Sequence, residues 1–157
     1  MSKIVRTVSE LIIVFVFIFG LYMIIHGHLT PGGGFQGGAV FASGMALLLV
    51  AFGANKIEER LKVSVFSMLE STAAIAFIGL AFGGVAVGFF YNFLVGSSIF
   101  GHVPPFGPNR GDMWTGGVIP LMNIAVGLKV IAGLSLIVLV MALASEKDCH
   151  KNDSMHL

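Results

Sequence analysis

Four long apolar stretches restrict this chain to a small set of folds. They run over Ile4–Ile25, Phe35–Phe52, Ser67–Phe93 and Gly117–Ala144. A hydrocarbon core of about 30 Å needs about 20 helical residues to cross it. With 56% hydrophobic and 11% charged residues, too few polar side chains remain to cover a soluble core. The sequence predicts an all-α membrane protein with four transmembrane helices, forming a single domain over 1–144 with a polar tail at 145–157.

Basic residues predict the orientation of these helices, because cytoplasmic loops carry an excess of Lys and Arg. Such residues flank the first helix at its start, fill the loop between the second and third helices, and follow the fourth. They are Lys3, Arg6, Lys56, Arg60, Lys62, Lys147 and Lys151. The other two loops together hold only Arg110. We therefore expect a multi-pass protein of the cell membrane with both termini in the cytoplasm.

A proline and a run of glycines separate the first two stretches. Neither helix can continue through this segment, so it predicts a short turn on the outer side. Small residues at four-residue spacing after the turn allow a second backbone to approach closely. The segment also matches G-x-G-x-x-G, but it lacks the strand that a dinucleotide site requires. The residues predicted to shape the turn and its packing are Pro31, Gly32, Gly33, Gly34, Phe35, Gly37 and Gly38.

Lys129 is the charged residue whose position most strongly indicates a function. It lies near the middle of the fourth stretch, roughly 13 Å from one end of the apolar run and about 22 Å from the other at 1.5 Å per residue. A cation at the centre of a membrane helix costs about 2.5–3.5 kcal/mol. Nearby Asn123, Gly127 and Gly133 would let water or a partner helix approach. We interpret Lys129 as part of an ion path, the alternative being a structural lysine held by carbonyls or an ion pair.

Glu10 and Glu70 are the acids inside the predicted spans. Each lies one to two turns from the cytoplasmic end, so each is either an ion-path residue or an interfacial side chain. Counted along separate helices, Lys129 lies about 10 Å deeper than both. The counter-ion of Lys129 is therefore expected on another subunit, unless burial keeps the lysine neutral.

Histidines gather on the predicted outer side, where His26, His28, His102 and Asp112 fall. Their spacing matches no recognised metal or haem site, so capping roles are favoured over ligation. His28 remains a candidate for proton relay. Cys149 stands alone, so no disulfide or CxxC pair is expected. We expect no cofactor, no metal and no nucleic-acid partner.

Two stretches carry a family resemblance. Residues 27–38, GHLTPGGGFQGG, resemble the GHxxPGGGFxGG signature of the MnhB/MrpB-like family, whose members are components of multisubunit Na⁺/H⁺ antiporters. Residues 116–129, GGVIPLMNIAVGLK, are similar to the second block of that family, which also ends in a lysine. The same module occurs in archaeal membrane-bound hydrogenases and their sulfur-reducing relatives. The resemblance implies an accessory subunit, with functional positions at Pro31, Gly34, Phe35 and Lys129.

The predicted function is that of a non-catalytic subunit that helps form a Na⁺ or H⁺ path at a subunit interface. The implied partners are large proton-channel-like subunits and small helical subunits, either free-standing or joined to hydrogenase-type subunits. Two alternatives remain open: a self-sufficient homo-oligomeric channel or carrier, and a purely structural subunit. An enzyme is least favoured, because no nucleophile–base pair lies in the spans.

Overall fold

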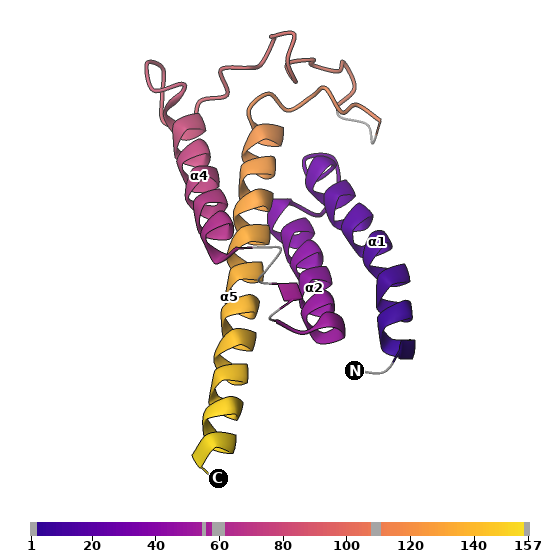
Figure 1. The fold of residues 1–157 in the computed structure, drawn as a ribbon. Helices are drawn as coiled ribbons and strands as arrows, with labels where there is room; N and C mark the ends of the chain where they lie inside the picture. The colour runs from indigo at the N-terminus through magenta and orange to yellow at the C-terminus, as the bar shows by residue number, and fades with distance from the viewer. Residues whose placement is uncertain (1–2, 55, 58–61, 108–110, 156–157) are drawn as a thin grey trace.

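The computed structural model describes residues 3–54, 56–57, 62–107 and 111–155, with side chains as far as residue 145. Within these ranges the chain forms four long helices and no strand: α1 (Lys3–Ile25), α2 (Gly34–Phe52), α4 (Val63–Phe82) and α5 (Ile119–Met155) (Figure 1). All four are long and apolar enough to cross a membrane, α5 through its Ile119–Ser145 portion. The all-helical prediction is confirmed. Arg60 and Arg110, used above for orientation, lie outside the described residues.

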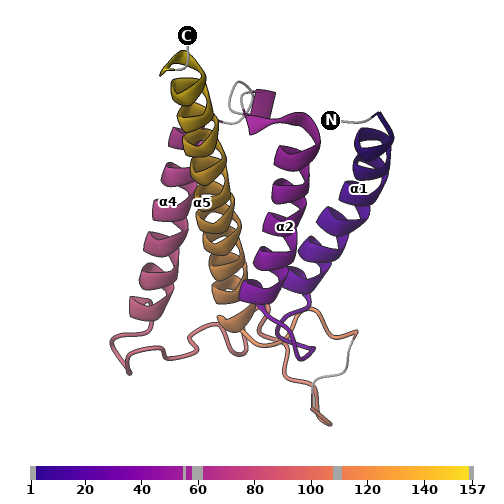
Figure 2. The same cartoon turned by 90° about the horizontal axis from the view of Figure 1, so that it is seen from below.

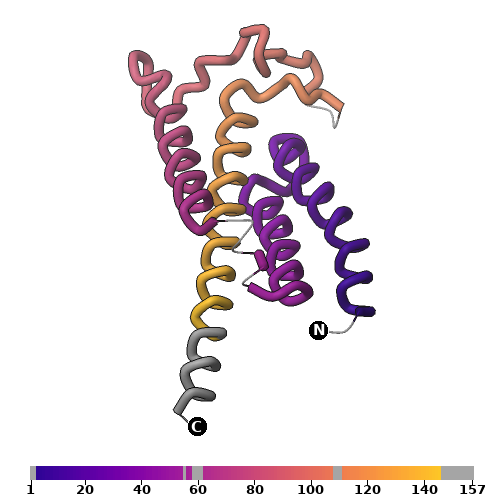
Figure 3. The backbone as a smooth tube through the Cα atoms, viewed as in Figure 1, coloured from indigo at the N-terminus to yellow at the C-terminus, as the bar shows by residue number. Residues whose placement is uncertain are grey.

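α5 is the central helix of the bundle. It packs against α2 on one side and α4 on the other, while α1 packs mainly against α2 (Figures 1 and 2). The 26–33 and 83–118 connections lie at one end of the bundle, opposite the end where α1 begins and α5 ends (Figure 3). This order separates α1 from α4 by two helices.

A hydrophobic cluster joins α2, α4 and α5 near the end where α2 finishes. Its buried members are Met45, Leu49, Ala54, Ile57, Phe66, Ala132 and Leu139. Elsewhere the helices meet through small residues. In lipid, close van der Waals packing replaces the hydrophobic drive between helices. Contacts between glycines therefore set much of the arrangement of α1, α2 and α5.

The predicted bounds of the third span were wrong. The third helix was expected over Ser67–Phe93, but α4 ends at Phe82 and gives way to turns. Gly83, Gly84 and Gly88 raise the free energy of continuing the helix, and Phe90 adopts a positive φ of 61°, which no helix contains. The fourth span was expected to end at Ala144, and the apolar portion of α5 ends at Ser145, although the helix itself continues as far as Met155. The hydropathy falls after Ser145, so the apolar portion ends there while the helix continues.

The 83–118 loop crosses the end of the bundle from α4 over α5 (Figure 1). Asn92 ties the start of this loop to its finish, since its Nδ2 donates to Gly116 O at 3.0 Å and its Oδ1 accepts from Val118 N at 2.8 Å. Phe100 stacks on Trp114, with ring centroids 5.3 Å apart. These contacts fix the position from which α5 starts.

Candidate functional site

Asn123 on α5 joins the ends of two other helices. Its Oδ1 accepts a hydrogen bond from Gly34 N at 2.8 Å, and its Nδ2 donates to Ile24 O at 3.3 Å. The first N–H groups and last carbonyls of a helix lack partners within that helix. Gly33 provides no side-chain cap for α2. The amide of Asn123 therefore caps the start of α2 and the end of α1 together.

Glycines surround this amide because a larger residue would not fit. A Cβ on Gly27 would collide with Asn123 Nδ2 and come within 2.8 Å of Gly33 Cα. A Cβ on Gly34 would collide with Asn123 O and come within 2.8 Å of Gly127 N. The backbone of the 26–33 connection thus lies directly against α5.

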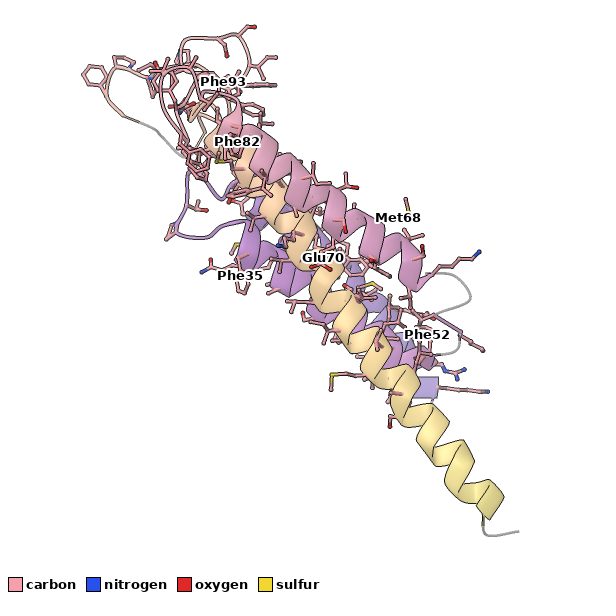
Figure 4. The ribbon with its side chains drawn as sticks, turned by 90° about the vertical axis from the view of Figure 1, so that its left-hand side faces the viewer. Phe35, Phe52, Met68, Glu70, Phe82 and Phe93 are labelled. Atoms are coloured by element: carbon pink, nitrogen blue, oxygen red, sulfur yellow. The ribbon has the colours of Figure 1, made fainter. Side chains whose placement is uncertain are left out.

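The next glycines of α2 set two helix crossings. A Cβ on Gly37 would lie 2.7 Å from Gly20 O of α1, and a Cβ on Gly38 would lie 2.9 Å from Gly127 O of α5. The remaining residues of the motif behave differently. Pro31 is exposed, Gly32 lies against the side chain of Met23, and the Phe35 side chain is 62% exposed (Figure 4). Phe35 therefore lies on the outside of this single chain.

Lys129 lies on the uncovered face of α5. Gly127 and Val130 contact α2, while Ala125 and Leu128 face α4. Lys129 falls between these two contact faces and is exposed. In the described part of the chain it forms no ion pair. Its side-chain nitrogen therefore lies mid-span on a surface that none of the described helices covers.

Glu70 and Glu10, the two predicted acids, occupy opposite parts of the bundle. Glu70 is half-buried and reaches from α4 onto α5, where a Cβ on Gly133 would lie 3.4 Å from its Oε1 (Figure 4). Gly133 is one turn from Lys129 along α5. Glu10 is exposed on α1, beyond α2. The structure thus brings Glu70, but not Glu10, into the neighbourhood of Lys129.

His28 lies against residues of the 83–118 loop. Its two ring nitrogens are buried without a hydrogen-bond partner, and it lines a cavity of about 400 Å³ together with His102 and Phe100. Burial lowers the pKa of His28 and outweighs the nearby backbone groups of Ile25 and Met113, which act to raise this pKa, while neighbouring His26 lowers it further. His26 instead stacks on Tyr22, with ring centroids 4.2 Å apart. His28 therefore belongs to the loop cavity and not to the surroundings of Lys129.

No metal cluster forms at these histidines in the described residues. Asp112 and His102 line a second cavity, of about 590 Å³, which His28 does not reach. No group of three or more His, Cys, Asp or Glu side chains in the described ranges could hold a metal ion. These candidate residues therefore lie in three separate places: Asn123 at the helix ends, Glu70 and Lys129 on α4 and α5, and the histidines and Asp112 at the loop cavities.

Sequence reasoning missed two contacts in this arrangement. Asn92 was not singled out, although an asparagine between glycine turns is a common way to satisfy loop backbone groups. Gly133 was noted only as a small residue near Lys129. An amide or a glycine inside an apolar helix is a usable signal, but its partner becomes evident only once the helices are placed side by side.

Comparisons with known proteins identify the family of this chain. A family model for a domain related to the MnhB subunit of Na⁺/H⁺ antiporters matches residues 4–136. An uncharacterised protein of Methanocaldococcus jannaschii is 38% identical over 74% of this chain, and the match spans 43% of that longer protein. A Staphylococcus haemolyticus protein named as an antiporter subunit, mnhB2, is 35% identical over 66% of this chain and 72% of its own length.

Proposed function

The chain belongs to the family of proteins related to the MnhB subunit of Na⁺/H⁺ antiporters, and we propose that it is a non-catalytic membrane subunit of a multisubunit antiporter. It is a multi-pass membrane protein with four apolar helices. In the proposal, its uncovered α5 face meets a partner subunit, and the two surfaces together enclose a path for Na⁺ or H⁺.

The exposure of Lys129 is the observation that carries this proposal. An ammonium at mid-span is costly against lipid, by about 2.5–3.5 kcal/mol even on the lower scale. Lys129 lies about 15 Å from Ile119 and about 24 Å from Ser145 by helix rise, so it cannot easily extend to either interface. A polar partner surface that covers α5 removes this cost. The same surface would supply the remaining groups of an ion path.

Position and charge support further details of the proposal. Lys3, Arg6 and Lys62 lie at the end of the bundle where α1 begins and α4 begins, which favours a cytoplasmic location for that end. The partners are proposed to be large proton-channel-like subunits and small helical subunits. The assembly is either a free-standing antiporter or an antiporter module joined to hydrogenase-type subunits.

Replacement of Lys129 tests the proposal. Lys129→Ala in the assembled complex should lower the rate of Na⁺/H⁺ exchange by about tenfold or more, equivalent to about 1.4 kcal/mol in a barrier. Subunit recovery should be unchanged, and Lys129→Arg should restore part of the rate. Ile75→Ala, an exposed apolar position on α4 and away from the uncovered α5 face, is the control. Normal exchange in a fully assembled Lys129→Ala complex would refute the ion-path role and favour a structural subunit.

Purification in mild detergent tests the partners. Mass spectrometry of the material that co-purifies should find several other membrane subunits. Nickel or iron–sulfur proteins among them would indicate a respiratory complex. Recovery of this chain alone as a discrete oligomer that conducts ions in liposomes would contradict the accessory role.

A further inference from the structure

We propose that Glu70 is the counter-ion of Lys129 within this chain, and that a monovalent cation arriving at the Glu70 carboxylate displaces the Lys129 ammonium. The functional part of this inference rests on the proposed ion path. The pairing of the two side chains does not, because it is argued from the packing of α4 on α5.

The charge content of the central helices is the first reason. α2 carries no Asp, Glu, Lys or Arg, α4 carries Glu70 as its sole charged residue, and the apolar portion of α5 carries Lys129 as its sole charged residue. Within α2, α4 and the apolar portion of α5 there is thus one acid and one base. Both side chains lie on the same edge of the α4–α5 pair. This placement lowers the free-energy cost of keeping an acid and a base in an apolar layer.

The contact between Glu70 and α5 is the second reason. A Cβ on Gly133 would lie 3.4 Å from Glu70 Oε1, 3.5 Å from Cδ and 3.8 Å from Oε2, so the carboxylate lies flat against this glycine (Figure 4). A methyl group would make an ordinary contact at these distances. A branched side chain would fill the place that the carboxylate occupies. The size of residue 133 therefore controls where Glu70 lies.

Helix geometry brings Lys129 to the same place. Residues four apart on a helix are neighbours, with Cβ atoms about 5–6 Å apart. Lys129 is four residues before Gly133, and its exposed side chain is free to change rotamer. In the proposal, a Lys129 rotamer that extends along α5 toward Gly133 brings the ammonium to the carboxylate with no helix movement. In the described residues the two groups are not paired, so the proposal requires a Lys129 rotamer other than the one in the structure.

The opposite edge of the α4–α5 pair has a contrasting character. An apolar groove of about 460 Å³ runs there, lined by Leu69, Ala73, Ala76, Ala125 and Leu128 among others. Glu70 and Lys129 follow Leu69 and Leu128 directly in the sequence, and at 3.6 residues per turn they fall on the other side of the helix contact. One edge of the α4–α5 pair is therefore apolar, and the other edge carries both Glu70 and Lys129.

This arrangement has a chemical consequence for ion exchange. A carboxylate and an ammonium that pair reversibly leave the carboxylate available to Na⁺ or H⁺ whenever the ammonium withdraws. Occupation of Glu70 by a cation in turn frees Lys129 to engage an acid of the partner that covers α5. The pair is therefore a switch whose two states differ in the charge presented at the subunit interface.

Carbodiimide cross-linking tests the contact without reference to transport. A hydrophobic carbodiimide converts the Glu70 carboxylate to an O-acylisourea, and attack by the Lys129 amine forms an amide while the urea leaves. In the assembled wild-type complex we expect mass spectrometry to find the linked Glu70 and Lys129 peptides. Gly133→Val should reduce the yield about tenfold, since the valine displaces the carboxylate. Gly79→Val, which adds the same side chain where nothing lies within 4 Å, is the matched control.

Three outcomes decide the inference. Carbodiimide labelling of Glu70 without the Lys129 cross-link would overturn the contact. A cross-link whose yield falls when Na⁺ replaces choline at constant ionic strength supports displacement by the cation, and an unchanged yield overturns it.

In a double-mutant cycle on exchange rate, Glu70→Gln and Lys129→Met should each cause about a tenfold loss, with the double variant no worse than the more severe single variant. Fully additive losses would overturn the functional coupling while leaving the ion-path role of Lys129 intact.

Discussion

The side-chain oxygen of Asn123 accepts a hydrogen bond from the backbone N–H of Gly34 across 89 positions of sequence, at 2.8 Å. This contact satisfies an N–H group that α2 cannot satisfy itself, and the amide nitrogen of the same side chain satisfies Ile24 O at the end of α1. An unsatisfied backbone group is costly in an apolar layer. Asn123 is therefore a structural link among three helices, whatever part it takes in an ion path.

Replacement of Asn123 by Ala should destabilise the bundle. The change leaves Gly34 N and Ile24 O without partners, at about 1–3 kcal/mol for each unsatisfied group. We expect a lower midpoint of thermal unfolding in detergent and a smaller yield of assembled complex.

A partial replacement separates the two hydrogen bonds of Asn123. Asn123→Asp keeps an acceptor for Gly34 N but loses the donor to Ile24 O, so it should rescue less than the full stability. Ala at the exposed position Ile137 is the control. An Asn123→Ala bundle as stable as the wild type would show that water satisfies both backbone groups and would contradict the capping role.

Enlargement of Gly38 should separate α2 from α5. A Cβ there would lie 2.8 Å from Val130 Cβ and 2.9 Å from Gly127 O, so Gly38→Val forces the helices apart. Overpacking of this kind costs about 1–3 kcal/mol. The measurement is the unfolding midpoint in detergent, with Gly79→Val as the control because its added side chain meets open space in this chain. Equal midpoints for the two valine variants would contradict the close crossing.

The helical class was predictable from sequence, because hydropathy over long windows reports the burial of whole segments in lipid. The ends of helices were less predictable. Hydropathy continues past Phe82 as far as Phe93, although glycines end α4 there. α5 differs in the opposite direction. It continues past Ser145 into polar residues, since a helix outside the membrane needs no apolar side chains.

The sequence offers candidate site residues, but it does not predict how they are arranged in space. Lys129, Glu70 and Asn123 are conspicuous as polar residues in apolar helices. Helix rise predicted that Lys129 lies about 10 Å deeper in the membrane than Glu70. In the structure α4 packs beside α5, and the Glu70 carboxylate lies against Gly133, which is one turn from Lys129 along α5. The partner of each polar side chain depends on which helices are neighbours and on their rotation, and neither quantity is encoded in local hydropathy.

Acidification should weaken the packing of the 83–118 loop on His28. The folded protein lowers the pKa of His28, chiefly because burial disfavours the imidazolium, so the unfolded loop binds a proton more readily than the folded one. Stability from this group is therefore complete above the ordinary histidine pKa of about 6.5 and is lost as the pH falls toward the lowered value. The other titratable side chains near it are His26, His102 and Asp112.

Limited proteolysis of the loop at several pH values measures this effect. Cleavage within 83–118 should accelerate as the pH falls below about 6.5 in the wild type. His28→Gln, which cannot become charged, should flatten this pH dependence. His26→Gln should largely retain it, because His26 stacks on Tyr22 at the surface and His28 keeps its buried position. A His28→Gln protein with the full wild-type pH dependence would assign the response to another group in the loop cavities.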